Sequence, residues 1–106
     1  MATVEDLQHI GLKTAKILEA DRVEGSEKLL KLQVSLGEER RQIVAGIGKT
    51  HSPESLIGKT IVIASALEPR MLMGIESQGM LLAASKDGEP VLLTTEHEVE
   101  PGTAIR

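Results

Sequence analysis

The sequence predicts an all-β fold with a short helix, and two patterns lead to this prediction. Short apolar or alternating segments recur along the 106-residue chain, bounded by glycine, proline or acidic residues typical of turns. One helix start, Ser52-Pro53-Glu54, interrupts the series after the third such segment. A chain of this length supports one modest hydrophobic core, so we expect residues 1–106 to form a single domain.

The first half of the chain is expected to hold a helical turn followed by three strands. Thr3 and Asp6 fit an N-cap with an acidic residue three positions later, which predicts a turn over residues 4–10 that Gly11 ends. Strict alternation of leucine or valine with polar residues makes the second strand the clearest. The three strands are expected at residues 12–20, 28–36 and 40–45.

The second half is expected to hold a short helix, two strands and a hairpin. The helix that begins at Ser52 must be short, because Gly58 follows closely. The strand at 60–66 reads as buried on both faces, and residues 68–79 read as a polar loop. The remaining elements are a fifth strand at 80–84, a hairpin turn at 86–89 leading into 91–94, and a turn at 101–102.

Five strands with one helix between the third and fourth is the pattern of an OB-fold barrel, here with a C-terminal hairpin extension. A β-sandwich also has short, regularly spaced strands and remains the alternative on pattern alone. In the OB-fold arrangement, the face of the second and third strands and the loops after the first and fourth strands are the usual ligand surface.

Composition narrows the classes of function. The formal charge is −4, so any attraction to nucleic acid must come from a local patch. There is no Phe, Tyr or Trp on which bases could stack, and no Cys for disulfides or thiolate metal sites. No apolar run is long enough to span a bilayer, and the N-terminus lacks the features of a signal peptide. We therefore expect a cytoplasmic protein that does not associate with membranes.

No catalytic, cofactor or metal motif is recognisable. Gly48-Lys49-Thr50 and Gly58-Lys59-Thr60 resemble the end of a phosphate-binding loop, but the glycine required at the start of that loop is absent in both cases. The three histidines are far apart in the sequence and lack the spacing of a helical metal site. The sequence thus gives no support for an enzyme, and we expect neither a cofactor nor a metal.

Basic residues are concentrated in the middle of the chain. From residue 40 to residue 86 there are six basic and three acidic residues, whereas five acids accompany a single arginine from residue 87 onward. On the expected fold, basic side chains converge on the second and third strands and the loop after the fourth. These candidates are Lys28, Lys31, Arg41 and Arg70. The alternative is that they merely solvate an exposed face.

Three methionines lie within or directly after the predicted loop at residues 68–79. Met71, Met73 and Met80 are suited to packing, because thioether side chains fill irregular gaps in a core that has no aromatic residues. Met80 is also placed to contact a ligand beside Ser77. The pattern leaves both roles open for Met80.

Six blocks of the sequence, in order, resemble the tRNA-binding domain family, the OB-fold module found at the C-terminus of many methionyl-tRNA synthetases and as freestanding proteins. Together the blocks extend over nearly the whole chain. They are Leu12–Ala20, Gly25–Leu32, Arg41–Ile47, Ser52–Lys59, Gly74–Ala83 and Pro101–Thr103.

The resemblance implies a non-catalytic module that binds the outer corner of folded tRNA and assists aminoacylation. It also implies a homodimer joined through the N-terminal turn and the C-terminal extension. The family often has an aromatic residue at or beside His51, and its absence here favours recognition of RNA shape. The resemblance adds Lys49, Ser77 and Met80 to the candidate contacts, which become Lys28, Lys31, Arg41, Lys49, Arg70, Ser77 and Met80.

A second function remains open. A secretion-associated branch of the same fold is described as chaperone-like, and a net charge of −4 suits a protein-binding module better than an RNA-binding one. The Ser77-Gln78-Gly79-Met80 block instead resembles the synthetase-associated branch.

Overall fold

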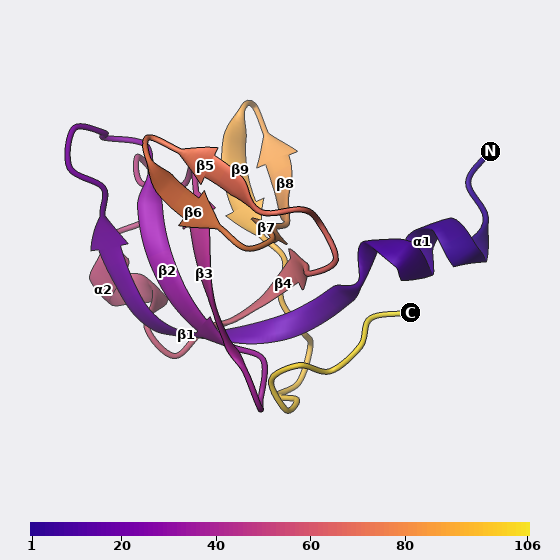
Figure 1. The fold of residues 1–106 in the computed structure, drawn as a ribbon. Coiled ribbons are helices and arrows are strands. Elements are labelled where there is room, and N and C mark those ends of the chain that lie inside the picture. The colour runs from indigo at the N-terminus through magenta and orange to yellow at the C-terminus, as the bar shows by residue number, and fades with distance from the viewer.

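A computed structural model describes all residues from 1 to 106. Two short helices accompany nine strands (Figure 1). The helices are α1 (Val4–Ile10) and α2 (Pro53–Leu56). The strands are β1 (Leu12–Arg22), β2 (Leu30–Ser35), β3 (Arg40–Ala45), β4 (Thr60–Ala64), β5 (Arg70–Leu72), β6 (Ile75–Ser77), β7 (Met80–Leu81), β8 (Ala83–Lys86) and β9 (Glu89–Leu92).

Five strands form one antiparallel sheet in the order β3-β2-β1-β4-β7, which curves into a nearly closed barrel (Figure 1). The long β1 pairs with β4 through its first part and with β2 through its second. A register shift between Ile17 and Glu19 lies where β1 passes from one partner to the other, as bulges do in barrels that bend sharply. The predicted OB-fold barrel is confirmed.

The core is aliphatic throughout, as the lack of aromatic residues requires. The alternating residues of β2 and the buried strand β4 supply much of it, which confirms the burial pattern predicted for both segments. Its largest fully buried apolar side chains are Ile17, Leu30, Leu32, Val34, Ile43, Leu56, Ile61 and Ile63.

Helix α1 forms where predicted but packs no side chain into the barrel. The Thr3 hydroxyl accepts from the Asp6 amide, and the Asp6 carboxylate accepts from the Thr3 amide, so both halves of the capping box are present. Gly11 ends the helix in the left-handed conformation. The helix has no buried residue and extends away from the barrel (Figure 1). None of the helices is long and apolar enough to cross a membrane.

Two segments differ from the sequence prediction. Residues 80–84 do not form one strand: β7 ends at Leu81, and β8 belongs to a separate hairpin with β9. The two halves have different partners: β7 pairs with β4, whereas β8 pairs with β9 through the predicted turn, where Asp87 and Gly88 have positive φ angles of 52° and 83°. The predicted polar loop at 68–79 contains a second hairpin, β5–β6, with Met73 at a φ of 50° in its turn. Methionine is unusual in that conformation, so the sequence did not indicate this turn.

The C-terminal segment returns to the start of β1. The side chain of Thr14 binds it twice: the Thr14 hydroxyl donates to the Glu100 carbonyl at 3.0 Å and accepts from the Thr103 amide at 3.0 Å. The Thr14 backbone adds two more bonds, to the Thr103 carbonyl at 2.9 Å and from the Gly102 amide at 2.8 Å. Ala104 then forms an isolated antiparallel bridge with Lys13. The two ends of the chain thus lie on the same side of the barrel (Figure 1).

Candidate nucleic-acid interface

The segment from Glu76 to Gly79 closes the barrel along the free edge of β3. The Gln78 amide donates to the Gln42 carbonyl at 2.7 Å, and the Gln78 side-chain oxygen accepts from the Gln42 amide at 2.9 Å. One step along the edge, the Val44 amide donates to the Ser77 hydroxyl at 2.9 Å. Side chains therefore supply hydrogen bonds where β3 has no neighbouring strand.

Ser77 is buried between the segment from Glu76 to Gly79 and the edge of β3. Its side chain is 1% exposed, and its hydroxyl donates to the Gly79 carbonyl at 2.9 Å while accepting from Val44. Both bonds are internal, and no surface of the hydroxyl is left for RNA. The structure thus gives the Ser77 hydroxyl a supporting place beneath the loop, not the place of a direct contact expected from the sequence.

Arg41 is also occupied by contacts within the protein. Its guanidinium donates to the Ser65 and Gln78 carbonyls and pairs with the Glu39 carboxylate at 3.3 Å. The side chain is 23% exposed and lines a separate small hollow. A guanidinium that is paired and hydrogen-bonded in this way is poorly placed to bind phosphate. Because Arg41 also lines a different hollow, the structure does not bring it together with the other candidates.

Three of the predicted lysines lie on adjoining segments. The Gly48 amide donates to the Lys28 carbonyl at 2.7 Å, which holds the turn bearing Lys49 against the start of β2. Lys31 follows on the outer face of β2, opposite Val44 of β3. Lys28 and Lys49 are exposed and Lys31 is partly exposed.

Sequence reasoning missed Arg22, an exposed cation beside these lysines. Its guanidinium donates to the Gly48 carbonyl at 2.9 Å from the end of β1, next to the turn that carries Lys49. The residue is exposed and forms no ion pair. Its position at the edge of the predicted loop after β1 was the available signal, since that loop is part of the usual OB-fold ligand surface.

Arg70 and Met80 meet at an apolar groove beside these lysines. The groove has a volume of about 300 Å³ and lies between the end of β3 and the segment from β7 to β8. Its walls include Val44, Leu82 and Ala83, and none of its lining residues is acidic. Met80 is 49% exposed here, so it is not a core residue.

The aliphatic stem of Lys28 connects the lysine-bearing segments to the apolar groove. Its Cε lies 2.8 Å from the point where a side chain at Gly46 would begin, and Gly46 lines the groove. Cations thus border the groove on the Lys28 side as well as at Arg70. None of Lys28, Lys31, Lys49 and Arg70 forms an ion pair with a carboxylate. We call these four cations and Met80 the basic face.

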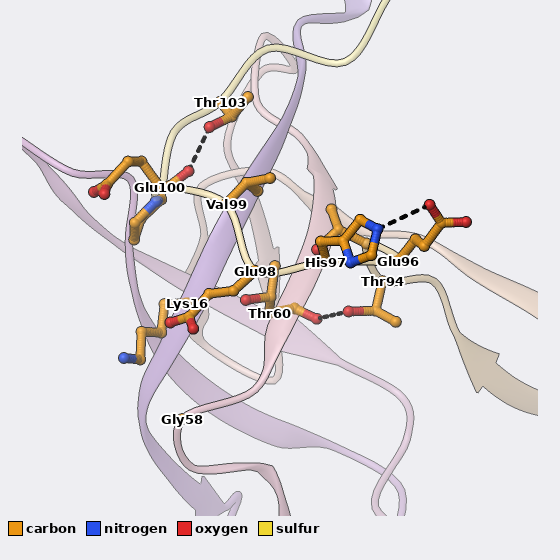
Figure 2. A pocket seen from close by; sticks show the side chains of 12 residues that line it. Lys16, Gly58, Thr60, Thr94, Glu96, His97, Glu98, Val99, Glu100 and Thr103 are labelled. Carbon is orange, nitrogen blue, oxygen red and sulfur yellow. Dashed lines mark hydrogen bonds and ion pairs between the residues drawn. The ribbon is translucent and has the colours of Figure 1, made fainter.

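A larger hollow of about 1000 Å³ has the opposite character (Figure 2). It is lined by the carboxylates of Glu96, Glu98 and Glu100, with Lys16 as its one lysine. It shares no lining residue with the groove. The acidic residues of the C-terminal segment are therefore gathered away from the basic face, which explains how a local cationic surface exists on a protein of net charge −4.

The nearly closed five-stranded barrel, with unpaired cations beside one groove, defines a small OB-fold domain. The family model described as "Putative tRNA binding domain" matches residues 12–104. The chain therefore belongs to the tRNA-binding domain family.

Relatives and solved structures agree with this assignment. The chain is 57% identical over 103 residues to a methionine–tRNA ligase of Caldanaerobacter subterraneus subsp. tengcongensis, which covers 97% of the chain but only 16% of that protein. The MetRS related protein from Pyrococcus horikoshii is 34% identical with a TM-score of 0.94, covering 100% of this chain and 98% of that one. The chaperone CsaA from Bacillus anthracis is 30% identical with a TM-score of 0.90, covering 100% and 99%.

Proposed function

We propose that residues 1–106 act as one domain that binds folded tRNA without catalysing a reaction on it. The observation that carries this proposal is the basic face of an acidic protein: Arg70 lines the groove, Lys28 borders it at Gly46, and Lys31 and Lys49 lie on the adjoining segments, all four without carboxylate partners. Unpaired lysine and arginine side chains bind phosphates and release the counterions around them. Membership of the tRNA-binding domain family supports tRNA as the RNA concerned.

The outer corner of the tRNA is the proposed point of contact. Without aromatic residues the domain cannot capture a run of single-stranded bases by stacking, so the shape and phosphates of a folded RNA are the features it can recognise. The direct contacts we propose are Lys28, Lys31, Lys49, Arg70 and Met80.

The proposed role is to raise the local concentration of tRNA for aminoacylation in the cytoplasm, either attached to a methionyl-tRNA synthetase or as its partner. The chain spans about 16% of the length of the methionine–tRNA ligases that it matches, and it aligns with them as the binding module alone. Binding of tRNA by this module would lengthen the time that the substrate spends near a catalytic domain.

We further propose that two copies form a homodimer through α1 and the C-terminal segment. Val4, Leu7 and Ile10 lie at helical spacing on α1 and are all exposed. A helix of seven residues that buries nothing against its own barrel needs another surface to stabilise it. A dimer would also present two basic faces to one rigid RNA.

The test is a titration of folded tRNA, a single-stranded RNA and a DNA duplex at several salt concentrations. We expect tRNA to bind best, with an affinity that falls as salt rises. Arg70→Ala should weaken tRNA binding and lower the salt slope by about 1, because one phosphate contact is lost. Lys59→Ala removes an exposed cation from a different hollow and should change neither quantity.

A second function is favoured by one comparison. The likeness to the chaperone CsaA extends over the whole chain at 30% identity, so a chaperone-like, protein-binding role is the alternative. If folded tRNA binds no better than the DNA duplex at low salt, the tRNA proposal fails. Suppression of the aggregation of an unfolded protein would then favour the alternative.

A further inference from the structure

The groove beside Arg70 is more apolar than phosphate binding requires. Seven of its ten lining residues are hydrophobic, including Val44 and Ile47 from the β3 side and Leu81 and Leu82 from the β7 side. Phosphates would bind to the lysines around it without needing such walls. The groove therefore suits a flat or apolar group of the ligand, which would enter it while the phosphates stay at the surrounding lysines.

The geometry points to a pocket for one unstacked nucleobase of the bound RNA. This inference rests on the proposed RNA-binding function and extends it from phosphate contacts to a base. Apolar walls favour the faces of a base over water, and the exposed Met80 thioether offers a polarizable surface where other RNA-binding proteins place an aromatic ring. The volume of about 300 Å³ is at the lower end of the range for small-molecule sites, which suits a single nucleoside.

A backbone donor lies at the same place. Along the free edge of β3, the Gln42 and Val44 amides donate to Gln78 and Ser77, but the next outward amide, that of Gly46, donates to no protein acceptor. Gly46 lines the groove and is exposed. Its N–H is free to bond to an oxygen or ring nitrogen on the edge of a base, as the amides before it bond to side chains.

Charge distinguishes a nucleotide from other occupants. Arg70 lines the groove, the Lys28 stem passes over Gly46, and no acidic residue lines it. A nucleotide carries its negative phosphate a short distance from its apolar base, which matches cations at the rim and hydrocarbon inside. An apolar protein side chain would use the walls but would leave both cations without a partner.

The test is a substitution that fills the groove with a larger apolar side chain and leaves the charge of the protein unchanged. Ala83 lines the groove, whereas Ala84, next to it on β8, is also exposed but does not line it. Ala83→Ile should weaken tRNA binding about tenfold, because one base contact is lost. Its salt slope should stay unchanged, since no phosphate contact is removed. Ala84→Ile is the matched control and should bind like the unaltered protein.

A spectroscopic probe gives a second readout. In an RNA hairpin with one bulged 2-aminopurine, entry of that base into the groove should change its fluorescence, and Ala83→Ile should abolish the change. If Ala83→Ile unfolds, the smaller Ala83→Val should give an intermediate loss. Equal tRNA affinity for the Ala83 and Ala84 variants overturns the base pocket while leaving tRNA binding intact.

Failure of the proposed function has a different signature, namely that the unaltered protein does not prefer tRNA to the DNA duplex. A groove that holds apolar side chains of proteins would give a third result. Ala83→Ile would then leave RNA affinity unchanged but reduce the suppression of aggregation of an unfolded protein. That result also overturns the base pocket.

Discussion

At the scale of single residues, burial and hydrogen bonding separate contacts from supports. Ser77 and Met80 are three positions apart and resemble the same family block, yet the first is 1% exposed and the second 49% exposed. Composition alone left both as turn or packing residues. The hydroxyl of Ser77 holds the loop to β3, so we expect its contribution to binding to be indirect, through the positions of Arg70, its cross-strand partner, and Met80.

Ser77→Ala should therefore lower the stability of the domain and leave the charge of the basic face unchanged. The change leaves the buried Val44 amide without its acceptor, at a cost of about 1 to 3 kcal/mol in the free energy of unfolding. Urea unfolding measures this cost. Ser85→Ala, on the exposed strand β8, should be near neutral. A variant at Ser77 that keeps full stability but loses affinity with a reduced salt slope would contradict the supporting role.

At the scale of elements, the sequence predicted those in which periodicity and turn chemistry agree. Helix α1, β2 and β3 formed within two residues of the expected bounds, because a capping box and strict alternation each determine one structure. The β5–β6 hairpin was missed because Met73 adopts a left-handed turn conformation that methionine seldom takes. The groove was missed for another reason. It is built from separate segments that only the closed barrel brings together.

The C-terminal segment depends on one close approach that the sequence did not show. Gly102 has a φ of 86°, and a side chain there would begin against the Leu36 carbonyl. Gly102→Ala should therefore release residues 100–106 from β1 and break the Thr103–Thr14 hydrogen bond. Hydrogen exchange at the Thr103 amide should rise strongly. Gly88→Ala, at a similar φ of 83° but in open space, should cost only about 1 kcal/mol and leave Thr103 protected.

At the scale of the whole molecule, charge is divided between two surfaces. The acidic hollow takes three glutamates of the C-terminal segment, and the basic face keeps its cations unpaired. Net charge, read from the sequence, argued against RNA binding, although the uneven distribution of basic residues pointed to the middle of the chain. Which cations are free was not predictable, because the Ser65 and Gln78 carbonyls that occupy Arg41 reach it only through folding.

The proposed dimer is testable through α1, because no side chain of that helix is buried in its own barrel. Leu7→Lys places a charge within the exposed apolar stripe and should give a monomeric mass by light scattering at micromolar concentration. Barrel unfolding in the monomer should be unaffected, since no α1 residue is buried. Affinity for tRNA should fall while the base fluorescence change persists, because each basic face stays intact but only one contacts the RNA. Gln8→Lys adds the same charge outside the apolar stripe and should leave the mass unchanged. A monomeric mass for the unaltered protein would refute the dimer without touching the basic face.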